Sequence, residues 1–257
     1  MILLTPEQTA TLREWFLPER PGPLVGQHII HTGYGTCWAD RWPDPRAILV
    51  ETAGNYALAG DPRALEPADL KGRITGFVEA SEPFVPLLLA AFPDAKRWDR
   101  VIFELRERPH VSLPRGYLIR RLDEADASHL QGLSPETAWI GKTWGGPTGL
   151  AASGRAWGAF AGTRLVSVAC VFFVGAQYEE IGVATEPEFR GRGLSAACAG
   201  SLCEEIWRRG HWSSWSTSPD NVASIRVAEK LGFSRQRQDC LYVVGLPKPV
   251  PPGRQET

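Results

Sequence analysis

The sequence predicts an α/β protein with a mixed sheet, organised in two parts. Apolar runs of strand length alternate with helical stripes along most of the 257 residues, which is typical of layered α/β proteins. A stretch with two prolines and a glycine, residues 109–116, interrupts this alternation. We therefore expect a smaller mixed α/β domain at residues 1–112, a second domain at residues 113–246 and a flexible tail at residues 247–257.

The first part begins with a helix start signal. Thr5 stands before Pro6 and three residues before Gln8, a capping-box pattern that predicts a helix running toward residue 16. Two apolar runs around a Gly-Asn turn, residues 47–52 and 56–60, predict a hairpin. A strand, a buried helix and another strand are then expected at residues 73–80, 83–92 and 101–106.

The second part has a longer series of elements. A strand, two short helices and three strands are predicted at residues 117–122, 123–130, 135–144, 156–161, 165–174 and 178–185. A helix then follows, because apolar residues recur at steps of four: Leu194, Cys198, Leu202 and Ile206. Gly210 ends it. A strand at residues 212–217 and a helix at residues 222–231 precede a last strand, in which Cys240, Tyr242 and Val244 alternate.

Composition and charge exclude several classes of partner. Lys and Arg number 28 against 29 Asp and Glu, a formal net charge of −1, which supplies no field for holding a polyanion. We therefore expect no nucleic-acid partner. The longest uncharged apolar run, residues 165–176, is far shorter than the roughly 20 residues of a membrane helix, so we expect no membrane partner. The first residues lack the features of a secretory signal, so we expect a cytoplasmic protein.

The cysteines and histidines show no metal-site pattern. Neither the five cysteines nor the five histidines have the spacing of a zinc site or of a nucleophile-base pair. We expect no metal.

The turn before the Leu194 helix carries the main functional signal. Arg190, Gly191, Arg192 and Gly193 lie between a predicted strand and that helix. A helix start offers backbone N–H groups without partners and a positive dipole end. The glycines let the main chain approach an anion, and the arginines add positive charge. The turn therefore predicts binding of a pyrophosphate.

Two motifs in this order resemble the GNAT superfamily of N-acetyltransferases. The first is similar to its pyrophosphate motif Gln/Arg-x-x-Gly-x-Gly/Ala, at Arg190, Gly193 and, with a departure at the last position, Ser195. The second is similar to its late Asn-x-x-Ala/Ser helix ending in Gly-Phe, at Asn221, Ser224 and Gly232-Phe233. The resemblance covers residues 117–245 and implies a GNAT-like acyl-CoA N-acyltransferase fold there.

This resemblance implies direct transfer of an acetyl group from acetyl-CoA to a primary amine. The pantetheine arm would lie along the strand, where the N–H of Val183 or Ala184 would polarise the thioester carbonyl. The expected cofactor-binding residues are Val183, Ala184, Thr185, Arg190, Gly191, Arg192, Gly193, Leu194, Ser195, Ala196, Asn221 and Ser224. For Asn221, capping of its helix is an equal alternative.

Transfer to an alkyl amine needs a base or a relaying water, because the amine is protonated at neutral pH. Glu179 and Glu180 are the candidate catalytic residues. Since side chains alternate along a strand, only one of them can face the acceptor, and parity with Val183 favours Glu179. The alternative is that one is solvated and the other is a structural ion-pair partner. Ala228 stands where the family often has a proton-donating tyrosine, so that role is not carried over.

Two functions stay open at this point. The first is an N-acetyltransferase whose acceptor is a small-molecule or peptide amine. The second is a catalytically weak acyl-CoA sensor or interaction module, consistent with Ala228 and with the strand at residues 212–217, which lacks an acid. The first part is either a diverged GNAT-like half or a structure that shapes the acceptor site or a dimer contact, and a homodimer is an open alternative.

Overall fold

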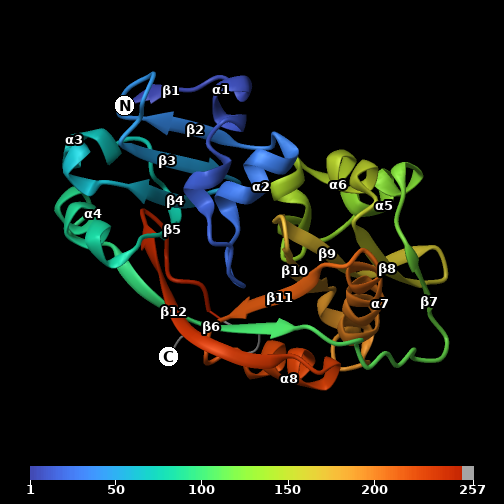
Figure 1. Ribbon diagram of the computed structural model, residues 1–257. Helices are drawn as coiled ribbons and strands as arrows, with labels where there is room; N and C mark the ends of the chain where they lie inside the picture. The colour runs from blue at the N-terminus through green and yellow to red at the C-terminus, as the bar shows by residue number, and fades with distance from the viewer. Residues whose placement is uncertain (251–257) are drawn as a thin grey trace.

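The computed structural model describes residues 1–250 and contains one mixed sheet of twelve strands (Figure 1). The strands follow one another across the sheet in the order β1-β2-β3-β4-β5-β12-β6-β11-β10-β9-β8-β7. The first six are β1 (Ile2–Leu3), β2 (Thr36–Ala39), β3 (Ala47–Thr52), β4 (Asn55–Gly60), β5 (Gly76–Glu79) and β6 (Lys96–Leu105). The second six are β7 (Leu118–Arg121), β8 (Ala156–Ala161), β9 (Arg164–Val174), β10 (Tyr178–Thr185), β11 (Trp212–Thr217) and β12 (Ser234–Val244).

Helices connect these strands and cover the sheet. The α-helices are α1 (Pro6–Ala10), α2 (Val25–Thr32), α3 (Pro67–Leu70), α4 (Val85–Ala91), α5 (Ala127–Gln131), α6 (Pro147–Ser153), α7 (Leu194–Arg208) and α8 (Val222–Leu231). The 3-10 helices are η1 (Arg13–Phe16), η2 (Pro62–Ala64), η3 (Glu82–Phe84), η4 (Glu124–Asp126), η5 (Ala138–Trp144) and η6 (Pro187–Phe189).

The pairing pattern of β1–β6 is repeated by β7–β12. In each set the first four strands are antiparallel neighbours, and the fourth and fifth are parallel. The last strand of each set leaves its own half: β6 pairs with β11, β12 pairs with β5, and β6 and β12 pair with each other. Each half of the sheet is therefore completed by a strand of the other half.

The exchanged strands also complete each other's hydrophobic cores. Val101 and Phe103 of β6 are buried in one cluster with Leu202 of α7. Tyr242 of β12 is buried in another cluster with Val78 of β5. The two halves therefore share both hydrogen bonds and apolar packing.

Most predicted elements are confirmed, including the mixed α/β sheet. The Thr5 capping box forms, but the helix ends at Ala10 and a 3-10 helix follows at Arg13–Phe16. The hairpin is present, with Ala53 as well as Gly54 at positive φ in its turn. The last strand starts at Ser234, earlier than its alternating residues indicated. The elements that were not predicted include the strands β1 and β2 and the helices α2, α3 and α6.

The predicted boundary falls in a segment without helix or strand, residues 106–117. The sheet nevertheless continues across it, because β6 lies between β11 and β12. The division into two domains stays a prediction. Of the predicted tail, residues 247–250 have no helix or strand, and residues 251–257 lie outside the described residues.

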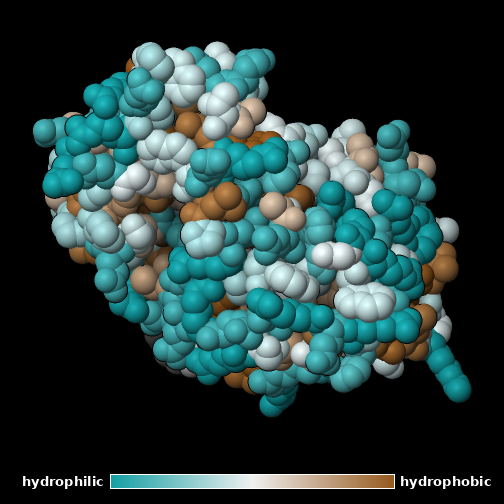
Figure 2. Space-filling model, viewed as in Figure 1, coloured by the Kyte–Doolittle hydropathy of each residue, from teal (hydrophilic) through white to brown (hydrophobic). Residues whose placement is uncertain are grey.

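Within residues 1–250, no helix has both the length and the apolar character needed to cross a bilayer. The face seen in Figure 2 is mainly hydrophilic, with small separate apolar patches.

We predict that residues 1–112 and residues 113–257, expressed separately, will each fail to form a stable folded monomer. Each fragment would expose a strand edge and a core surface that the partner strand covers in the intact chain. Co-expression should restore a soluble complex with cooperative unfolding, measured by gel filtration and circular dichroism. Two fragments that fold independently would contradict the interdependence of the halves.

Candidate active site

The sheet opens between β10 and β11. These parallel strands pair only from Tyr178–Trp212 to Glu180–Ser214. Beyond that point β10 stays paired with β9, and β11 stays paired with β6. A register shift between β10 and β9 also falls directly after Glu180, and such bulges often end pairing near active sites. We call the resulting wedge the β10–β11 opening.

The glycine-rich turn connects β10 to α7. Gly191 and Gly193 have φ values of 76° and 79°, which favour glycine. A Cβ built on either would meet no heavy atom within 4 Å, so the space around the turn is open. The bond from Ala197 N to Gly193 O, 3.1 Å long, begins the α7 ladder, so the amides before Ala197 have no partner within the helix. They form a site suited to an anion.

The two arginines of the turn hold it in place. The Nε of Arg190 donates to the carbonyl of Thr185 over 3.2 Å, and its Nη2 contacts Glu136. Arg192 donates to the hydroxyl of Tyr117 and to the carbonyl of Glu188. Both guanidinium groups therefore raise the positive potential at the turn while fixing its conformation.

Ser195, the departure from the GNAT motif, has a structural role. Its hydroxyl lies 2.8 Å from that of Thr185, which lies 2.7 Å from that of Ser167. This chain of hydroxyls ties the first turn of α7 to β10 and β9.

The other predicted binding residues of this region contribute main chain. The side chains of Leu194, Ala196 and Ala184 are buried in the apolar core, with Val183 packed against it. Only their backbone groups are therefore suited to contact a cofactor.

Asn221 and Ser224 form a helix cap. The Oδ1 of Asn221 accepts the N–H of Ser224 over 3.1 Å at the start of α8. The hydroxyl of Ser224 accepts the indole N–H of Trp215 over 2.9 Å. Capping, one of the two alternatives for Asn221, is what the structure shows.

Glu179 lies in an ion-pair cluster. Its fully buried carboxylate contacts Arg209 at 2.7 Å, Arg155 at 3.1 Å and His211 at 2.9 Å. These three groups come from outside β10, and Arg209 follows the end of α7. These ion pairs lie on the α7 side of the sheet and favour the structural alternative for this residue, while the choice of Glu179 as the base stays a prediction.

Glu180 faces the other side of the sheet, at the closed end of the β10–β11 opening. It is 4% exposed and accepts a hydrogen bond from the hydroxyl of Ser216 on β11. Its Oε2 is buried and has no hydrogen-bond partner among the described residues. Burial raises the pKa of Glu180 to about 7, against the Ser216 bond and the nearby charge of Arg100, which lower it.

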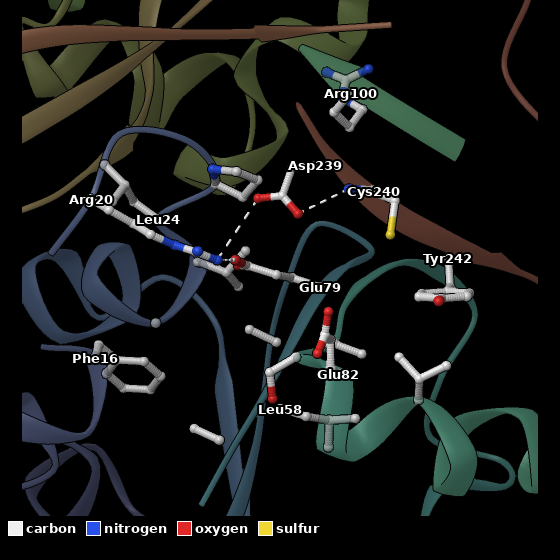
Figure 3. A pocket seen from close by; sticks show the side chains of 18 of the residues that line it. Phe16, Arg20, Leu24, Leu58, Glu79, Glu82, Arg100, Asp239, Cys240 and Tyr242 are labelled. Atoms are coloured by element: carbon white, nitrogen blue, oxygen red, sulfur yellow. Dashed lines mark hydrogen bonds and ion pairs between the residues drawn. The ribbon is translucent and has the colours of Figure 1, made fainter. Parts of the chain in front are cut away.

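A cavity of about 980 Å³ lies on this side of the sheet (Figure 3). Its wall includes Arg100, which donates to Ser216 over 3.3 Å, so a short chain of hydrogen bonds leads from the cavity wall to Glu180. From the loop before α2, Arg20 reaches Glu79 at 3.3 Å and Asp239 at 3.8 Å (Figure 3). The cavity therefore lies between the two halves and is built from both.

The comparisons identify the family of this chain. The model of the family described as GNAT acetyltransferase matches residues 23–242. The chain belongs to this family. A protein of Streptomyces virginiae named "uncharacterized N-acetyltransferase in mutA 5'region" is 41% identical over 218 residues, which span 82% of this chain and 90% of that protein. The Bacillus subtilis protein named "uncharacterized N-acetyltransferase YdfB" is 24% identical over 262 residues, 94% of this chain and 98% of that protein.

Solved structures share the fold over nearly the whole chain. A GCN5-related N-acetyltransferase-like protein from Streptococcus suis has a TM-score of 0.71 at 18% identity, covering 93% of this chain and 98% of that one. A tandem GNAT protein from the clavulanic acid biosynthesis pathway has a TM-score of 0.59 at 16% identity, covering 96% and 99%. The protein is thus an acyltransferase of the GNAT type. The family match begins at residue 23, whereas the resemblance found from the sequence motifs began only at residue 117.

Sequence reasoning missed the residues around Glu180. Ser216 and Arg100 were not candidates, because no motif marks them and they meet Glu180 only through the pairing of β11 with β6. The serine-rich strand was the available signal: polar side chains on a central strand need partners.

We predict that replacing both turn glycines, Gly191→Val with Gly193→Val, weakens CoA binding at least about tenfold, because two Cβ groups fill the open space and strain positive-φ backbone. Isothermal calorimetry with CoA measures the effect. Gly210→Val is the matched control: Gly210 has a φ of 78°, equally open surroundings and a place after the other end of α7. Equal losses in both proteins would contradict a binding role for the turn.

We predict that Glu180→Gln stabilises the folded protein at pH 8 and has a smaller effect at pH 5. A raised pKa means that the ionised form is disfavoured in the fold, so stability is lost as pH rises from about 4.5 through about 7. The gain at pH 8 should be at most about 3 kcal/mol. Urea unfolding at both pH values measures it, and a variant less stable at pH 8 would contradict the desolvation of Glu180.

Proposed function

We propose that this GNAT enzyme transfers an acetyl group from acetyl-CoA directly to a primary amine. One observation carries the proposal: the free amides at the start of α7 and the buried carboxylate of Glu180 lie at two ends of one strand, β10, along the β10–β11 opening. This arrangement matches a ligand with a pyrophosphate at one end and a reacting acyl group at the other.

The chain has groups suited to each part of that ligand. The amides of residues 191–196 would bind the pyrophosphate, with Arg190 and Arg192 adding positive charge. Main-chain groups of Val183, Ala184 and Thr185 would bind the pantetheine amides. When bound, acetyl-CoA supplies an acetyl group activated as a thioester.

Glu180 would act as the general base. A carboxylate with a pKa of about 7 is ionised in half of the molecules at neutral pH and is basic enough to accept a proton from an ammonium or an attacking amine. The amine nitrogen bonds to the acetyl carbon, the carbon–sulfur bond breaks, and the proton leaves through Glu180. The N–H of Val183 or Ala184 would stabilise the oxyanion, and a thiol pKa near 8.5 makes thiolate a sufficient leaving group.

The sensor alternative receives less support. Family membership favours transfer, and the strand that lacks an acid contributes Ser216, which bonds to Glu180. Ala228 is fully buried in the core, so a proton donor at that position is not needed to explain the site.

We predict that kcat/KM rises with pH with an inflection near 7, because Glu180 must be ionised to accept a proton. Glu180→Gln should lower the rate by about 10²- to 10⁴-fold and remove the inflection. The assay incubates the purified protein with acetyl-CoA and a library of amines and measures the release of free CoA thiol.

Glu179→Gln is the control for this prediction. It should lower the melting temperature, because Arg209 and Arg155 lose their carboxylate, and leave the inflection near pH 7 in place. An inflection that survives in Glu180→Gln would remove Glu180 from the mechanism. CoA binding without release of thiol for any amine would favour the sensor.

A further inference from the structure

Arg100 is a half-buried cation beside the proposed base. Its Nε is buried and has no partner among the described residues. Nη2 donates to Ser216, and the guanidinium lies 4.2 Å from the centre of the Trp98 ring. Glu180 and Asp220 act on its charge through space. Burial lowers the pKa of Arg100 to about 10, which leaves it charged at neutral pH.

The other two arginines of the cavity wall are held in ion pairs with neighbouring carboxylates. Arg20 pairs with Glu79 and Asp239, and Arg97 pairs with Asp99 at 2.8 Å. A guanidinium whose Nε–H is removed from water without a partner among the described residues is in a costly state. At the wall of a large cavity, an anionic group of a ligand would offset that cost.

The same place also suits an amine. Ser216 lies between the two charged groups: it accepts from Arg100 and donates to Glu180. Each of its two charged partners has one buried atom without a hydrogen-bond partner among the described residues: Nε of Arg100 and Oε2 of Glu180. A ligand could satisfy both atoms with a hydrogen-bond donor that faces Glu180 and an acceptor that faces Arg100. The donor and the acceptor would lie only a few atoms apart on that ligand.

We propose that the acceptor is an amine with a carboxylate close to its amino group, as in an α- or β-amino acid, and that Arg100 binds this carboxylate. The proposal rests on the proposed function, in which Glu180 receives the proton of that amino group. The rest of the cavity, whose wall includes Phe16, Leu58 and Tyr242, gives room for a large side chain.

The test compares amino acids with their decarboxylated amines, for example phenylalanine with phenethylamine and lysine with cadaverine. With acetyl-CoA and the full chain, the wild type should acetylate the best amino acid with a kcat/KM about 10- to 100-fold above that of its amine, the range expected for charged hydrogen bonds. Arg100→Gln should remove this preference by lowering kcat/KM for the acid only, and Arg100→Lys should retain part of it.

Arg97→Gln is the matched control. It removes the same charge from the same strand and the same cavity, but Arg97 is 66% exposed and already paired with Asp99. The acid-to-amine ratio should stay unchanged. Calorimetry with CoA checks that the Arg100 variants are folded, because Arg100 lies away from the glycine-rich turn.

Several outcomes would overturn the proposal. The first is a wild type that uses the amines as well as the acids. The second is an Arg100→Gln variant that slows acid and amine equally while shifting the pH inflection, because this would make Arg100 an electrostatic partner of Glu180 only. If no amine of either kind is acetylated, the proposed function fails, and calorimetry on the CoA-loaded protein decides the binding claim: carboxylated ligands should bind more tightly than their amines, and equal binding would refute it.

Discussion

The exchange of β6 and β12 is the constraint on which the active site depends. Because β11 is held by β6 up to Thr217 and β10 is held by β9 up to Thr185, the two strands can separate after Glu180 without leaving either one unsupported. Antiparallel neighbours on both outer sides satisfy half of the main-chain groups of each strand. The groups that face the wedge are left for a ligand, and the wedge keeps its shape because its walls are parts of one continuous sheet.

The repeat produces a second wedge, which has a different chemistry. In the first half, β4 pairs in parallel with β5 from Asn55–Phe77 to Ala57–Glu79 and then stays paired with β3 to Gly60. The helix that follows, α3, has four residues and a proline at its start, so it offers neither the array of amides nor the dipole of α7. Residues just past the pairing, Leu58 and Ala80, line the cavity instead. One wedge thus suits a pyrophosphate ligand, while the other became part of the cavity.

Much of the second half could be predicted from sequence, because its signals are local. The strands at residues 156–161, 178–185 and 212–217 and the helix at residues 222–231 appear with the predicted bounds, since alternation, caps and C-terminal glycines act within a few residues. The β6–β12 exchange could not be predicted, because it pairs residues that are at least 130 positions apart in the chain and produces no periodic pattern in the sequence. The surroundings of Glu179 and Glu180 could not be predicted for the same reason: parity showed that they point to opposite faces, but the arginines that occupy one face come from distant elements.

Two adjacent carboxylates thus take different roles through their neighbours alone. Around Glu179, Arg155 and Arg209 supply direct charge pairs, so the buried carboxylate is satisfied within the fold. Around Glu180, one hydroxyl and a cation at longer range leave one carboxylate oxygen without a hydrogen-bond partner within residues 1–250, a costly state that a ligand would relieve. The cation, Arg100, belongs to β6 of the first half. The first half is therefore more than a support, because it contributes a charged group to the surroundings of the proposed base.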